Sequence, residues 1–143
     1  MENPPASPSI ARAAVFGLLA AQGVALVYGV LAEVFDLSLG LVIVGLVGGW
    51  VIGWAVVNGA WSGRFHLIVP RVRWLATLIA VVCWIEAAIV GYVSSQLLYQ
   101  AASTPLLERL SLPGLLEYLS GSVFSASILG LAAMALVAWR SAR

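Results

Sequence analysis

Hydrophobic residues fall into four long runs along the chain, at about residues 10–35, 37–61, 74–99 and 115–139. Each run is longer than the roughly 20 residues that an α-helix needs to cross the ~30 Å hydrocarbon core of a bilayer. A helix satisfies its own backbone hydrogen bonds in lipid. A membrane-spanning strand needs only about ten residues, so runs of this length favour helices over strands. The pattern therefore predicts an all-α, polytopic membrane protein with four transmembrane helices.

The first three runs are separated by two different connections. Asp36 lies in a connection so short that the first two helices must form a tight antiparallel hairpin, with Asp36 or Ser38 as the candidate N-cap of the second helix. The connection at residues 62–73 is polar and basic, and Pro70 within it predicts a break in helical structure. This connection is the main interruption of the chain.

The last connection, at residues 100–114, holds two prolines, and residues 106–110 are compatible with a short amphipathic turn at the membrane interface. The first nine residues, 1–9, are rich in proline and serine and are expected to form a disordered lead. Residues 10–143 then form one domain, which we predict to be a four-helix bundle made of two antiparallel hairpins.

The composition agrees with a lipid environment. Hydrophobic residues make up 62% of the 143 residues and charged residues only 9%, against about 25% charged residues in a typical soluble domain. A soluble domain of this size could not bury so much apolar surface. The bilayer is therefore the first expected partner of this chain.

The arginines predict the orientation. All seven basic residues are arginine, and only Arg109 falls on the side of the last connection. The other six lie on the side of the termini and the middle connection, and they are Arg12, Arg64, Arg71, Arg73, Arg140 and Arg143. The positive-inside rule places that side, with both termini, in the cytoplasm. Trp61, Trp74 and Trp139 would form an aromatic belt there, and Tyr99 and Tyr118 would lie opposite.

Three of these arginines, Arg64, Arg71 and Arg73, form a basic cytoplasmic loop. Its simplest interpretation is a topology signal that also meets anionic lipid headgroups, and the alternative is a docking site for a cytoplasmic protein. Three arginines beside a membrane do not indicate a nucleic-acid ligand.

Small residues recur at four-residue spacing on the first two helices. The first stripe is Ala13, Gly17, Ala21, Ala25 and Gly29, and the second is Gly45, Gly49 and Gly53. Small residues let helix backbones approach closely in lipid, although glycine and alanine are also simply frequent in membrane helices. We expect the two stripes to pack against each other within the first hairpin.

Glu86 lies at the centre of the third hydrophobic run, where a carboxylate costs at least about 2.5–3.5 kcal/mol on insertion scales. Lipid favours the neutral carboxyl group, which can bond a partner helix. The expected role is a structural hydrogen bond to Gln22, Asn58 or a serine of the fourth helix, and the alternative is a proton- or cation-coupled site. Glu33, near the outer end of the first helix, is expected to be solvated, or else to share a cavity with Glu86.

The remaining residues argue against an enzyme. The chain has one cysteine, Cys83, and one histidine, His66, whereas a structural zinc site needs about four such ligands and a b-type haem two histidines. Hydrolase, nucleotide-binding and zinc-protease motifs are absent from the sequence. No catalytic residue, metal or cofactor is expected.

The run at residues 45–56, Gly-Leu-Val-Gly-Gly-Trp-Val-Ile-Gly-Trp-Ala-Val, with Arg64 after it, resembles a loose group of uncharacterised small bacterial membrane proteins. The resemblance implies a bacterial inner-membrane location and brings no activity. The chain is also similar to small multidrug resistance transporters in its four short-looped helices and its membrane glutamate. In that family, however, the acid lies in the first helix, and dual-topology members lack so strong an arginine bias.

Two functions follow as hypotheses. The first is an accessory or scaffold protein that packs through its small-residue faces, as a homo-oligomer or within a larger membrane complex. The second is a small oligomeric proton-coupled transporter or channel that uses Glu86.

Overall fold

The computed structural model describes residues 8–35, 38–61, 69–99, 110–120 and 122–142. All regular structure within these ranges is helical, in the order α1 (Ile10–Phe35), α2 (Ser38–Ala60), α3 (Pro70–Tyr99), α5 (Leu112–Ser120) and α6 (Ser122–Ser141). The all-α class is therefore confirmed. Three helices, α1, α2 and α3, are long and apolar enough to cross a membrane.

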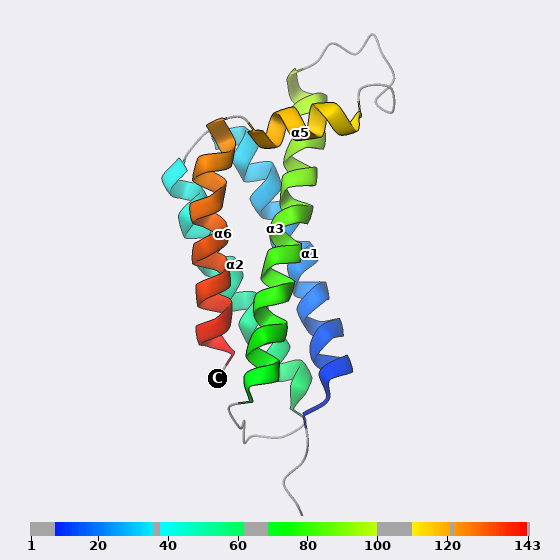
Figure 1. Cartoon of the computed structure of the whole chain (residues 1–143), viewed down its shortest axis with the longest axis vertical. Coiled ribbons are helices and arrows are strands. Elements are labelled where there is room, and N and C mark those ends of the chain that lie inside the picture. The colour runs from blue at the N-terminus through cyan, green and yellow to red at the C-terminus, as the bar shows by residue number, and fades with distance from the viewer. Residues whose placement is uncertain (1–7, 36–37, 62–68, 100–109, 121, 143) are drawn as a thin grey trace, which may run out of the picture.

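The long helices lie side by side along the long axis of the molecule, and each runs opposite to the one before it in the chain (Figure 1). Both α2 and α3 contact α1 and also α6. The short α5 lies across the end at which α1 and α3 finish, and it contacts α3 and α6 (Figure 1).

The fourth hydrophobic run differs from the prediction of one helix over residues 115–139. The structure divides it between α5 and α6, with Gly121 between them. Ser111 caps α5, because its hydroxyl accepts a hydrogen bond from the backbone N–H of Gly114 at 3.2 Å. Hydropathy alone does not separate a short helix lying across the end of the molecule from the apolar helix that follows it. Of the amphipathic turn predicted at residues 106–110, only Leu110 lies inside the described ranges.

The third helix begins four residues earlier than predicted. Pro70 is its first residue, a position where the missing N–H costs nothing and the fixed φ suits a helix. The carbonyl of Val69 accepts the backbone N–H of Val72 at 3.0 Å and begins the hydrogen-bonded ladder. The second helix begins at Ser38, while the alternative cap Asp36 lies outside the described residues.

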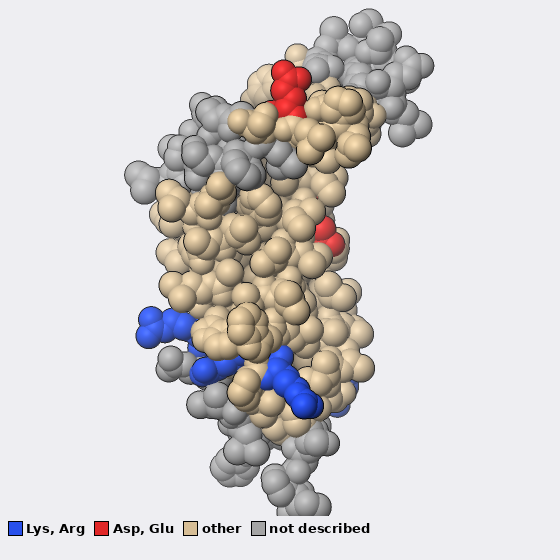
Figure 2. All heavy atoms as spheres, viewed as in Figure 1, with Lys and Arg blue, Asp and Glu red and all other residues tan. Residues whose placement is uncertain are grey.

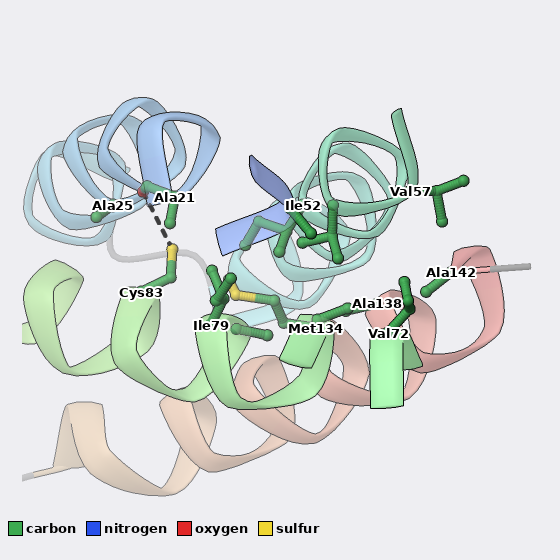
Figure 3. Packing of buried hydrophobic residues seen from close by; sticks show 14 of the residues in the cluster. Ala21, Ala25, Ile52, Val57, Val72, Ile79, Cys83, Met134, Ala138 and Ala142 are labelled. Carbon is green, nitrogen blue, oxygen red and sulfur yellow. Dashed lines mark hydrogen bonds between the residues drawn. The ribbon is translucent and has the colours of Figure 1, made fainter. Parts of the chain in front are cut away.

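The core is built mainly from small and β-branched side chains at the helix seams (Figure 3). The largest fully buried side chains are Ile52, Val56, Cys83 and Met134, and the described part of the chain buries no charged residue. Large apolar side chains point outward instead, such as Leu19 at 69% exposure and Trp74 at 60%. An outer surface of this kind is stable in lipid, not in water.

Candidate functional site

A polar pair joins α1 and α3 midway along the molecule. The side-chain amide of Gln22 donates a hydrogen bond from Nε2 to Oε2 of Glu86 at 2.8 Å. Gln22 is exposed and Glu86 is half-buried. Among the three partners considered for Glu86, the structure selects Gln22. Asn58 instead donates to the carbonyl of Trp54, one turn earlier in its own helix, at 2.7 Å.

The close approach of α1 and α3 positions this pair. The thiol of Cys83, one turn before Glu86, donates to the carbonyl of Ala21 at 3.3 Å (Figure 3). Further along the seam, a Cβ atom added to Gly29 would lie 2.6 Å from the carbonyl oxygen of Ala87. Ala25, between them in the stripe, is 2% exposed. The α1 stripe is therefore the seam with α3, and Gln22 and Glu86 lie at its rim.

The α2 stripe faces α6. A Cβ atom added to Gly45 would lie 2.6 Å from the carbonyl oxygen of Gly130, and one added to Gly53 would lie 2.8 Å from that of Ala138. Between them, Gly49 lies against the backbone of Met134. The expectation that the two stripes pack on each other is wrong, because each stripe meets a helix of the second half of the chain.

The contact between α1 and α2 uses other glycines. Gly59 approaches the backbone of Arg12, so that an added Cβ would lie 2.7 Å from its carbonyl oxygen. Gly48 lies against a side chain instead, since a Cβ atom added to it would lie 2.6 Å from Cγ1 of Val24. Gly17 of the α1 stripe meets both neighbours, because its added Cβ would lie 2.5 Å from Val56 of α2 and 2.6 Å from Ile79 of α3.

Glu33 has a separate environment at the α5 end. The hydroxyl of Tyr118 in α5 donates to its carboxylate, and the hydroxyl of Tyr99 donates to its backbone carbonyl at 3.1 Å. Burial, together with the Glu33 carboxylate, raises the pKa of Tyr118, so its hydroxyl remains protonated at neutral pH. Glu33 lies about 16 Å along α1 from Gln22 and has its own partners. The suggestion that Glu33 and Glu86 flank one cavity therefore gains no support.

The sequence does not predict this tyrosine contact, because it only indicates that Tyr118 lies opposite the cytoplasmic aromatic belt. The rings of Tyr118 and Tyr92 lie 5.7 Å apart, and Tyr92 also accepts the backbone N–H of Ser111 at 3.5 Å. A glycine in α3, Gly91, leaves room for the Tyr118 hydroxyl. The sequence signal for this contact is a glycine next to a tyrosine, Gly91 and Tyr92, near the end of α3. That pair identifies no partner until α5 packs against it.

We predict that Tyr118→Phe loosens α5 without unfolding the other helices. The change removes one hydrogen bond to a carboxylate, worth roughly 1.5–3 kcal/mol. Amide hydrogen exchange in Leu112–Ser120 should become faster, while exchange in α2 stays unchanged. Ser120→Ala is the control, because within the described ranges that hydroxyl donates to the carbonyl of Glu117 in α5 itself. Equal effects of the two substitutions would contradict this role for Tyr118.

A groove of about 420 Å³ lies between α1 and α2. Its lining consists only of alanine, glycine and valine, namely Ala20, Gly23, Val24, Val27, Val44, Val47, Gly48 and Val51. Glu86 does not line it. A groove without polar groups offers no chemistry to recognise a polar substrate or an ion.

The basic residues gather at the end of the molecule opposite α5 (Figure 2). Arg71 and Arg73 belong to the first turn of α3, so they are not loop residues as predicted, while Arg64 lies outside the described ranges. Arg12 donates from Nη2 to the carbonyl of Trp61 at 3.4 Å, which ties the start of α1 to the end of α2.

Comparison of the chain with protein-family models, with curated proteins and with solved structures gives no match. Within the described residues, no three His, Cys, Asp or Glu side chains come together as metal ligands. The polar pair of Gln22 and Glu86 is thus the feature from which a function has to be argued.

Proposed function

We propose that this protein is a non-enzymatic membrane scaffold that crosses the bacterial inner membrane four times, as two antiparallel hairpins with both termini in the cytoplasm. The α6 helix has 20 residues, enough for about 30 Å, and would supply the fourth crossing beside α1, α2 and α3. Arginines and tryptophans at one end and tyrosines at the other support this orientation.

The observation that carries the proposal is an exposed amide, Gln22, bonded to the half-buried Glu86 near the middle of two long apolar helices. Gln22 and Glu86 lie near the middle of α1 and α3, beside the exposed side chains of Leu18, Val82 and Ile89. A polar group that faces hydrocarbon is costly, and membrane proteins direct such groups toward another helix. We infer that the outer face around this pair is covered by a further helix.

A second copy of the chain is the partner that the chemistry favours. An amide carries both donors and an acceptor, and a carboxyl group carries acceptors and, when neutral, one donor. Two copies facing each other across a two-fold axis can therefore bond each Gln22 to the Glu86 of the other chain. The small-residue stripes already pack against α3 and α6 of the same chain. A contact with a second copy therefore has to use other groups, such as this polar pair.

The alternative of a proton-coupled transporter or channel would require Glu86 beside a hydrated cavity. Glu86 instead bonds Gln22 on the outer face, and the 420 Å³ groove between α1 and α2 does not include it. These contacts favour the scaffold.

The test measures self-association of the full chain in liposomes, with energy transfer between labelled copies as the readout. We expect Gln22→Leu and Glu86→Leu each to weaken association roughly tenfold, because interhelical hydrogen bonds in lipid are worth about 1–2 kcal/mol in model helices. Glu86→Gln keeps a donor and an acceptor and should change it less than about threefold. Asn58→Leu is the matched control, since among the described residues Asn58 bonds within α2, to the carbonyl of Trp54.

Two results would overturn the proposal. One is a wild-type chain that remains monomeric at high protein-to-lipid ratio. The other is a proton flux into proteoliposomes that Glu86→Gln abolishes, which would favour the transporter instead.

A further inference from the structure

The end of the molecule at which α3 begins and α6 ends carries a concentration of positive charge (Figure 2). Four described arginines lie there: Arg12, Arg71, Arg73 and Arg140. The described acidic residues lie elsewhere, because Glu86 is midway along α3, Glu33 is near the last turn of α1, and Glu117 is in α5. No described carboxylate therefore neutralises this end.

Arg73 is held in a defined position within this cluster. Its guanidinium carbon lies 5.6 Å from the centre of the Trp139 ring of α6, a cation–π distance. The Trp139 ring in turn meets Trp74 edge-on, with 5.0 Å between the ring centres. The guanidinium is thus fixed between two helices instead of extending freely into solvent.

One donor of this guanidinium is unused. The Nε atom of Arg73 is buried and has no hydrogen-bond partner among the residues that the structure describes. A buried donor of a charged group is costly to leave unpaired. Within the described residues the guanidinium of Arg73 therefore has an aromatic neighbour, Trp139, but no carboxylate to neutralise its charge.

Two further arginines lie at the same end of the molecule as Arg73. Arg71 is exposed in the same first turn of α3, and Arg140 is exposed next to Trp139 on α6. The dipole at the start of the 30-residue α3 adds to the positive potential. Planar guanidinium groups match the oxygens of a phosphate.

We propose that Arg73, with Arg71 and Arg140, binds the phosphodiester group of an anionic phospholipid. The site lies at one end of the apolar outer surface formed by the long helices, and Trp74 lies beside it with 60% of its surface exposed. Tryptophan prefers the headgroup region, where it can contact both the polar and the apolar parts of a lipid. A ligand that has a phosphate and an acyl chain fits these neighbours better than a free phosphate does.

The experiment measures lipid binding to the full chain in a neutral detergent by native mass spectrometry, with phosphatidylglycerol, phosphatidylcholine and inorganic phosphate as probes. Phosphatidylglycerol should bind roughly tenfold more tightly than phosphatidylcholine, and inorganic phosphate at equal concentration should not displace it. Arg73→Lys keeps the charge and the topology signal but loses the planar fork and the stacking on Trp139. It should weaken phosphatidylglycerol binding roughly tenfold.

Arg12→Lys is the matched control, because Arg12 lies at the same end but bonds the carbonyl of Trp61. It should change binding less than about twofold. Arg140→Lys, at an exposed position, tests the same site without disturbing buried contacts and should weaken binding roughly threefold. Arg73→Lys and Arg140→Lys variants that bind like the wild type would overturn the site, as would equal affinity for the two lipids. Displacement by inorganic phosphate would overturn the assignment to a lipid.

Discussion

Gly49→Ile is expected to separate α2 from α6 and to lower the free energy of unfolding by about 3 kcal/mol, at the upper end of the usual cost of overpacking. A Cβ atom at Gly49 would lie 3.0 Å from both the carbonyl carbon and the Cα of Met134, and closer still to its carbonyl oxygen. Backbone atoms in a helix cannot rotate away as a side-chain end can. The strain therefore has to move the whole of α6.

The measurement is unfolding of the purified chain by titration with a denaturing detergent, with loss of helical signal as the readout. Gly23→Ile is the matched control, because a Cβ atom at Gly23 meets nothing within 4 Å and opens into the groove between α1 and α2. Gly23→Ile should shift the transition by less than about 1 kcal/mol. Equal shifts for the two variants would show that Gly49 does not form a close contact with α6.

Gly29→Val is expected to have the second largest effect, about 1–3 kcal/mol. An added Cβ at Gly29 would lie 2.6 Å from the carbonyl oxygen of Ala87 and 2.7 Å from the Cβ of Val90. The substitution acts on the seam of α1 and α3, four residues before Glu33, so it should also accelerate hydrogen exchange in α5. Gly23→Val, on the same helix, provides the control.

A covalent link can check the same seam without relying on stability. The chain has one cysteine, Cys83, whose Sγ lies 3.3 Å from the carbonyl oxygen of Ala21. Ala21→Cys should allow an oxidant to join α1 to α3 within one chain, and Gly29→Val should slow that reaction. Failure of the Ala21→Cys variant to crosslink would argue against α3 as the neighbour of the α1 stripe.

Stability and association should respond to different residues in this protein. The glycine variants act on seams inside one chain, so they change unfolding first. Gln22→Leu acts on an exposed side chain and should change self-association while leaving unfolding nearly unaffected. Since the small-residue stripes are internal, the specificity of any contact with another chain depends on polar groups.

The sequence by itself determined the helical class and the positions of most helices. The first helix spans residues 10–35 as predicted, because a long apolar run has to close its backbone hydrogen bonds within itself. The gathering of Arg12, Arg71, Arg73 and Arg140 at one end also follows from the chain alone. Helices of similar length that alternate in direction bring every second connection to the same side.

Only the tertiary structure decided which faces meet. Four-residue spacing places Gly45, Gly49 and Gly53 on one side of α2, but that spacing does not say which helix lies there. The rotation of each helix depends on the packing of all its neighbours at once, and here it turns the α2 stripe to α6 and the α1 stripe to α3. The same rotation brings Gln22 to Glu86, two residues far apart in sequence that a pattern of polar positions could not pair uniquely.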